Sequence, residues 1–213
     1  MKSARPLRVG RLTNVFPKAD AAVHAAADAA VRVLADHGAM VADAELPDGP
    51  FEEAAELVIM MEAASSFSDL LRSGRCAELS DPHGQINGYA SMEFSTGDYL
   101  QVQRVRTFLQ RKIDELFDRF DVIAAPGQDS TAIPFSAPPE SEDREFPIDN
   151  RQPDAISSLC GLPAITVPCG FSNARLPLGV QFLGRALNDH AVIAAANLFQ
   201  AHTDWHTKRP PMA

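Results

Sequence analysis

The sequence contains few cysteines and no long hydrophobic run. Cys76, Cys160 and Cys169 are its three cysteines, an odd and low number that argues against a disulfide framework and favours free thiols in a reducing compartment. No segment approaches the ~20 apolar residues that a membrane helix needs, and the N-terminal residues lack the apolar core of a signal peptide. We therefore expect a cytoplasmic protein without a membrane partner.

Runs of positive charge are also absent. The chain has 19 Lys and Arg residues against 28 Asp and Glu residues, which gives a formal net charge of -9. Such a chain repels a phosphate backbone on average, so we expect no nucleic-acid partner. A hydrophobic content of 46% in 213 residues is typical of an ordinary globular protein. The length predicts one domain, with two small ones as the alternative.

The first half of the chain predicts a strand–helix–strand unit followed by helices. Residues 6–12 and 39–49 are the strands, and the alanine-rich segment between them is a helix that stops at Gly38. A second helix is predicted over 51–71 and a loop over 72–91. Thr96 is the expected N-cap of a long helix beginning near Asp98. Its apolar face is predicted to consist of Tyr99, Val102, Val105, Phe108, Leu109, Ile113, Leu116, Phe117 and Phe120.

The second half of the chain predicts three strands and two helices. Residues 120–126 form a short apolar strand, and 163–171 and 176–185 form two more. Helices are expected over 153–160 and 189–202. The element order favours an α/β fold with a mixed β-sheet flanked by helices. We expect one domain over 1–213, made of a strand–helix–strand unit (6–47), a helical region (51–120) and a part with strands, a pocket loop and the final helix (120–213).

Several motifs together resemble the amidase signature family. They are the long helix "DYLQVQRVRTFLQRKIDELF", then "FDVIAAPG", "GLPAITVPCGF" and "LPLGVQFLGR", and several of them follow one another along the chain as they do in the family. The resemblance covers essentially the whole chain and corresponds to the C-terminal part of that family's domain. It implies hydrolysis or transfer of amide groups, with no metal and no organic cofactor.

The catalytic residues of the family are absent from this sequence. Family members use a Ser–cis-Ser–Lys triad and a Gly/Ser-rich loop that holds the oxyanion, all in their N-terminal half, and none of the twelve glycines here lies in such a cluster. The resemblance therefore implies no catalytic residue in this chain. Because the chain begins with Met1, we considered a truncated gene product, one half of a split enzyme or a shortened chain.

The substrate-pocket candidates are Gln128, Asp129 and Ser158. Gln128 and Asp129 follow a predicted strand, where loops of α/β sheets border the ligand crevice. Ser158 precedes the Gly-Leu-Pro motif at a position where many family members carry asparagine, so helix capping is the alternative role. Residues 149–151 fall near a stretch that selects substrate in related enzymes.

Other reactive side chains have plainer interpretations. Ser65 and Ser66 lie in a predicted helix without glycines, so packing or solvent exposure is favoured over catalysis. Small buried thiols are favoured over nucleophiles at Cys160 and Cys169. His202 and His206 lack further metal ligands nearby, and a histidine at a helix C-terminus needs no metal.

Three functions remain open from the sequence. The first is the C-terminal half of an amidase, inactive alone and completed by an N-terminal amidase half that would share a small amide substrate with it; general amidases are favoured over the tRNA amidotransferase branch. The second is a non-catalytic binding or remnant half-domain, with a homodimer as its expected assembly because an exposed sheet edge and apolar face need cover. The third is an independent hydrolase that uses Cys160 or Cys169.

Overall fold

The computed structural model describes residues 5–132 and 152–209, without the side chains of His83 and Asn87. A five-stranded sheet has the order β2-β1-β3-β5-β4. Its strands are β1 (Arg8–Leu12), β2 (Met40–Ala44), β3 (Val122–Pro126), β4 (Ala164–Phe171) and β5 (Pro177–Gly184). β1 runs parallel to β2 and β3, whereas β5 runs antiparallel to β3 and β4. The predicted mixed sheet of an α/β fold is confirmed.

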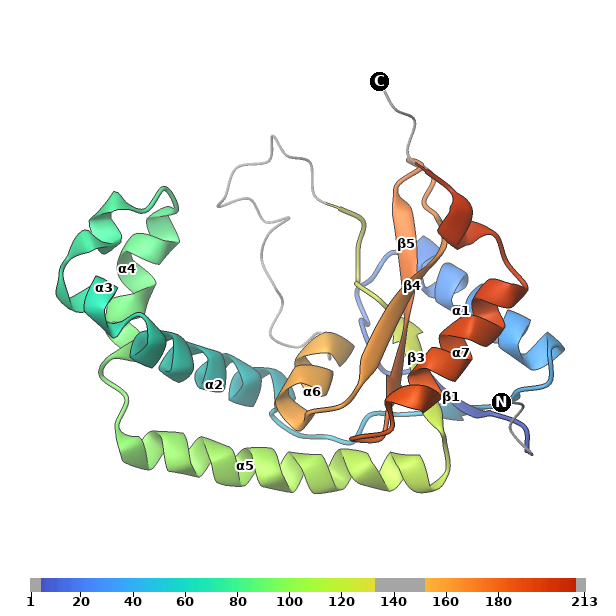
Figure 1. Ribbon diagram of the computed structural model, residues 1–213, viewed down its shortest axis with the longest axis horizontal. Helices are drawn as coiled ribbons and strands as arrows, with labels where there is room; N and C mark the ends of the chain where they lie inside the picture. The colour runs from blue at the N-terminus through green and yellow to red at the C-terminus, as the bar shows by residue number, and fades with distance from the viewer. Residues whose placement is uncertain (1–4, 133–151, 210–213) are drawn as a thin grey trace.

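Helices cover both faces of this sheet (Figure 1). α1 (Ala21–Asp36) and α7 (Asp189–Ala201) lie on one face, and α2 (Phe51–Ser66), α5 (Thr96–Asp114) and α6 (Pro153–Cys160) lie on the other. The shorter helices in the described ranges are α3 (Ser68–Arg72), α4 (Pro82–Ser91), and the 3-10 helices η1 (Arg75–Glu78), η2 (Glu115–Asp118) and η4 (Trp205–Thr207). No helix in the described ranges is long and apolar enough to cross a membrane.

Each face of the sheet has its own hydrophobic core. Alternate residues of a strand point to opposite faces, so Phe182 packs toward α1 and α7 while Leu183 packs toward α5 and α6. The predicted stripe of α1 is confirmed, because its buried residues are Val23, Ala27, Ala30, Val31 and Leu34. All five residues of β3 are buried, as expected of a strand covered on both sides.

The predicted loop at 72–91 is wrong, because α4 lies within it. The carboxylate of Asp81 accepts a hydrogen bond from the Gly84 N–H at 3.1 Å, and Pro82 occupies the first helical position, where it needs no N–H partner. Gly88 lets α4 approach Leu71 of α3 closely, because a Cβ there would lie 2.5 Å from Cδ2 of Leu71 and the leucine side chain would have to shift.

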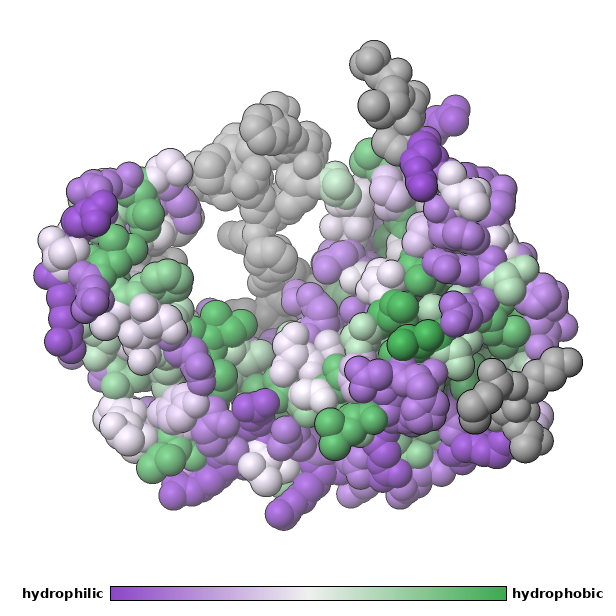
Figure 2. Space-filling model, viewed as in Figure 1, coloured by the Kyte–Doolittle hydropathy of each residue, from purple (hydrophilic) through white to green (hydrophobic). Residues whose placement is uncertain are grey.

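Three boundaries and one packing assignment also differ from the prediction. The N-cap of α5 is Ser95 rather than Thr96, because Ser95 and Asp98 form a reciprocal capping box. The helix predicted over 51–71 is interrupted at Phe67, and α5 ends at Asp114, before η2. Phe108, which was predicted on the apolar face of α5, is 55% exposed. Figure 2 shows mainly hydrophilic residues, with scattered hydrophobic ones, along the edge of the molecule that α5 forms in Figure 1.

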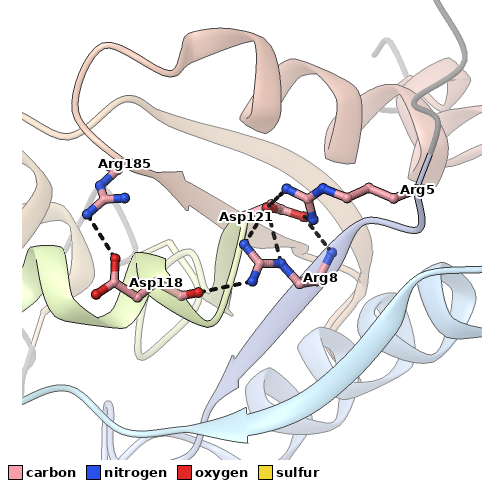
Figure 3. Close-up of polar contacts among 5 residues, drawn as sticks. All are labelled: Arg5, Arg8, Asp118, Asp121 and Arg185. Atoms are coloured by element: carbon pink, nitrogen blue, oxygen red, sulfur yellow. Dashed lines mark hydrogen bonds and ion pairs between the residues drawn. The ribbon is translucent and has the colours of Figure 1, made fainter.

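A cluster of arginines and aspartates joins β1 to the turn before β3 (Figure 3). Both carboxylate oxygens of Asp121 accept hydrogen bonds from Arg5, at 2.7 and 2.9 Å, and Asp121 also accepts from the Arg8 guanidinium and backbone N–H. Asp118 bonds Arg8 through its carbonyl and Arg185 through its carboxylate. Burial alone would raise the pKa of Asp121, but the bonds from Arg8 and Arg5 lower it to about 2.

We predict that Asp121→Asn destabilises the chain at neutral pH. Because the folded pKa of Asp121 lies below its unfolded value of ~3.9, the stabilisation is complete above pH ~4 and is lost as the pH falls toward 2. The free energy of unfolding at pH 7 should fall by about 2 kcal/mol, as measured by urea unfolding. Asp43→Asn is the control, since the exposed carboxylate of Asp43 pairs with Arg11 at the surface and should contribute much less. An Asp121→Asn chain as stable as the wild type at pH 7 would contradict the role of this cluster.

Candidate functional site

Two of the three predicted pocket residues follow β3, and the third lies on α6. Gln128 is exposed just after β3, and Asp129 is half-buried with its carboxylate accepting a hydrogen bond from the Ser130 hydroxyl at 3.0 Å. Ser158 is exposed on α6. Their role in substrate binding stays a prediction. Residues 149–151 lie outside the described residues.

A row of side chains on the sheet lies beside Gly127, the first residue after β3. The register pairs Ala125 of β3 with Gln181 of β5, and Gln181 with Thr166 of β4. Residues paired in this way point to the same face, which here is the face turned away from α1 and α7. The Gln181 carboxamide donates through Nε2 to Oγ1 of Thr166 at 3.3 Å. This pair was not predicted from the sequence, although Gln181 is a polar residue within the otherwise apolar strand β5.

Glycines keep the surface next to this row flat. The Gly127 N–H donates to the carbonyl of Gly179 at 2.8 Å, which extends the β3–β5 pairing by one bond. A Cβ at Gly127 would lie 3.0 Å from Cγ2 of Thr166, and one at Gly179 would lie 2.9 Å from it. Side chains at these positions would therefore displace Thr166. Backbone, amide and hydroxyl groups thus dominate this part of the sheet face.

Helix α6 is held at both ends by side chains from other helices. The carboxylate of Glu52 on α2 accepts a hydrogen bond from the Gln152 N–H at 2.7 Å, at the start of α6. Arg106 of α5 donates through Nε to the Leu159 carbonyl at 2.6 Å, and Gln110 donates to the Cys160 carbonyl at 3.2 Å. These bonds satisfy the last carbonyls of α6, which have no partner within the helix. These bonds hold α6 in place, and with it the exposed side chain of Ser158.

The cysteines and the serine pair do not form a nucleophilic site. Cys160 and Cys169 are buried, and burial raises the pKa of their thiols to about 11 and about 12, so the thiolate is scarce at neutral pH. Burial and the raised pKa both favour the packing role that was predicted for these thiols. Ser65 and Ser66 are exposed at the end of α2 and line a cavity of about 560 Å³ between α2, α3 and the start of α5. No lysine or histidine is among the described residues that line it.

The histidines near the C-terminus are not arranged as metal ligands. The His202 ring stacks on His37 with ring centroids 3.5 Å apart, so the pair joins the ends of α7 and α1. His206 lies in η4, beyond the end of α7. Within the described parts of the chain, no group of three or more His, Cys, Asp or Glu residues is placed to hold a metal ion.

We predict that Arg106→Met loosens α6. The substitution keeps the aliphatic part of the side chain but leaves the Leu159 carbonyl without its hydrogen bond, which should lower the free energy of unfolding by about 1–2 kcal/mol. Hydrogen exchange should accelerate in α6 more than in β3. Arg104→Met is the matched control, because Arg104 contacts the Gln101 side chain of its own helix. Equal exchange in both variants would contradict the role assigned to Arg106.

Both a protein-family model and curated proteins match this sequence. The Amidase family model matches residues 1–193. A glutamyl-tRNA(Gln) amidotransferase subunit of Roseiflexus sp. (strain RS-1) is 31% identical over 238 residues, covering 98% of this chain and 47% of that protein. The corresponding subunit of Chloroflexus aggregans (strain MD-66 / DSM 9485) is 29% identical over 235 residues, with the same coverage. The chain therefore spans about half the length of these curated relatives.

Solved structures show the same fold over nearly the whole chain. A bacterial aryl acylamidase of the amidase signature family matches with a TM-score of 0.79 at 22% identity, covering 97% of this chain and 46% of that one. A structure described as an unexpected vestigial protein complex, concerning an s-triazine catabolic enzyme, matches with a TM-score of 0.77 at 25% identity and covers 95% and 44%. With the family model matching most of its length, the chain belongs to the Amidase family, whose members include the amidase signature enzymes.

Proposed function

We propose that this chain is the C-terminal half of an enzyme that cleaves or transfers amide groups, and that it forms one wall of the substrate pocket. The observation that carries the proposal is the coverage: 98% of this chain matches only 47% of its Roseiflexus relative. The other half would supply the nucleophile and the oxyanion donors, which this sequence lacks as a motif. By itself, the chain would not turn over amides.

The pocket wall in this proposal consists of residues 127–132, helix α6 and the row Ala125–Gln181–Thr166. Gln128 and Asp129 offer an amide and a carboxylate to a polar substrate group, and Ser158 offers a hydroxyl from the fixed helix α6. No metal and no organic cofactor enter the proposed reaction. The substrate is a small amide, which an activated hydroxyl of the other half attacks at the carbonyl carbon.

The sequence favours general amidases over the amidotransferase branch, and this preference stays a prediction. The Roseiflexus and Chloroflexus relatives are amidotransferase subunits, whereas one of the solved structures is an aryl acylamidase. An assay therefore needs substrates of both kinds.

A second candidate is a half-domain that binds without catalysing. The observation in its favour is that both faces of the sheet carry buried hydrophobic cores formed by this chain's own residues. Such a chain has the means to fold without the other half. Its assembly would be a homodimer or a complex with another protein.

The two candidates differ in the amide-cleaving activity expected when the chain is combined with the half that it lacks. We would purify the chain alone and also after co-expression with the half of the Roseiflexus relative that it does not match. Ammonia or amine release would be measured from an aliphatic amide, an aryl amide, a urea-like carboxamide and glutamine. We expect no turnover by the chain alone and turnover of at least one substrate by the complex. Turnover by the pure chain would contradict the proposal, and a stable but inactive complex would favour the binding half-domain.

Variants of the pocket wall then test the site in the active complex. Gln128→Ala, Asp129→Ala and Ser158→Ala should each raise KM for a polar amide by about threefold to tenfold, the effect of one lost hydrogen bond. Ser65→Ala is the matched control, since Ser65 lies at the end of α2 in the helical region. Unchanged KM in all three variants would remove these residues from the pocket.

A further inference from the structure

Strand β4 lies at one end of the described sheet and is covered on one face only. Its buried residues Val167 and Cys169 pack into the core under α1 and α7. Alternate residues of a strand point to opposite faces, and on the opposite face Ala164, Thr166 and Pro168 are all exposed. β3, by contrast, is buried over its whole length. The sheet is therefore open at β4, both at its edge and on the face that carries the candidate site.

The hydrogen bonds around β5 show which backbone groups of β4 point outward. The Gly127 N–H donates to the Gly179 carbonyl, so Gly179 directs its backbone groups toward β3. In an antiparallel pair, residues exchange hydrogen bonds at every second position. Gly179 is paired with Pro168 in the β4–β5 register, so the backbone of Pro168 faces away from β5. The same alternation turns the backbone groups of Thr166 and Ala164 outward.

The free edge of β4 thus has a defined set of donors and acceptors. These are the N–H groups of Ala164 and Thr166 and the carbonyls of Ala164, Thr166 and Pro168, and no described strand pairs with them. Pro168 suits an edge position, because it has no N–H to offer. Edge strands are commonly protected from pairing by charged side chains, but no charged residue occurs in Ala164–Phe171.

We propose that the edge of β4 over 164–168 is an assembly surface that pairs with an extended segment of the other half of the enzyme. This inference rests on the proposed function. The relatives supply the occupant, because about half of their length has no counterpart in this chain. Main-chain hydrogen bonds to a free strand edge are a general mode of peptide recognition. A segment bound here would lie next to Thr166, and it would bring the other half beside the proposed pocket wall.

A second copy of this chain would pair with the edge less completely. In the symmetric antiparallel pairing centred on Thr166, Ala164 of one copy would face Pro168 of the other. Proline has no N–H to donate to the Ala164 carbonyl, so one acceptor on each copy would stay unpaired. A different segment without proline at that position can pair all five outward groups. The edge therefore fits the other half better than it fits itself.

The first test follows hydrogen exchange of individual amides by NMR. In the isolated chain, the Ala164 and Thr166 amides should exchange quickly, whereas those of Ile165 and Val167, which point toward β5, should be protected. After addition of the unmatched half of the Roseiflexus relative, exchange at Ala164 and Thr166 should slow by at least about tenfold. The Ile165 and Val167 amides are the internal control, since their partner is β5 in both states.

The second test removes one outward N–H. Thr166→Pro deletes it, and Thr166→Val is the matched control, because valine also lacks the hydroxyl but keeps the N–H. When the tagged chain is co-expressed with the unmatched Roseiflexus half, Thr166→Pro should reduce the bound fraction about tenfold relative to Thr166→Val. Both isolated variants should stay folded, because this N–H points away from β5. An unfolded Thr166→Pro chain would mean that the N–H serves this chain's own sheet, and it would overturn the inference.

The outcomes separate this inference from the proposed function. Binding of the other half with fast exchange at Ala164 and Thr166 would overturn the inference alone and leave the proposed function standing. Equal binding by the proline and valine variants would do the same. A wild-type chain that binds no second half would overturn both. Protection of the two amides in a dimer of the isolated chain would assign the edge to self-association and would likewise overturn the inference.

Discussion

Strand β5 lies between β3 and β4 in the sheet, and both hydrophobic cores depend on this position. Its residues pair with all five residues of β3 and with seven residues of β4. Phe182 enters the core under α1 and α7, and Leu183 enters the core with α5 and α6. The same alternation turns Gln181 toward the second face, where it meets Thr166. Without β5, strand β4 would have no partner in the sheet, and the residues of the candidate site on β3 and β4 would no longer lie side by side.

The site depends on this sheet and on a helix whose ends are tied to other elements. Glu52 holds the start of α6, and Arg106 and Gln110 hold its end. These bonds come from helices α2 and α5, which lie far away in sequence. In the proposed pocket, these contacts would order the wall before a ligand arrives and so reduce the cost of ordering it on binding. This agrees with the proposal that the chain contributes binding contacts and the other half contributes the reacting groups.

Local signals made much of the fold predictable. Helix α6 was found at its predicted bounds, because Pro153 suits the first turn and Gly161 adopts the left-handed conformation after the last residue. The apolar stripe of α1 was predicted from its helical periodicity, and strand β3 was predicted from its short continuous apolar run. Helix α4 was missed, because the close contact of Gly88 with Leu71 is a tertiary contact that leaves no periodic pattern. Gln181 was missed for a similar reason: its contact with Thr166 becomes visible only when β4 and β5 are paired.

We propose that this chain is one half of an amidase domain and that the catalytic residues belong to the half it does not match. Sequencing the DNA upstream of the Met1 codon, together with the rest of the source genome, tests it most directly. We predict an open reading frame, either in frame with this chain or in another gene, that encodes a lysine and a Gly/Ser-rich loop of the amidase signature type without a C-terminal half of its own. A genome in which no such unpaired half exists would contradict the claim, and the chain would then be understood as a non-catalytic half-domain.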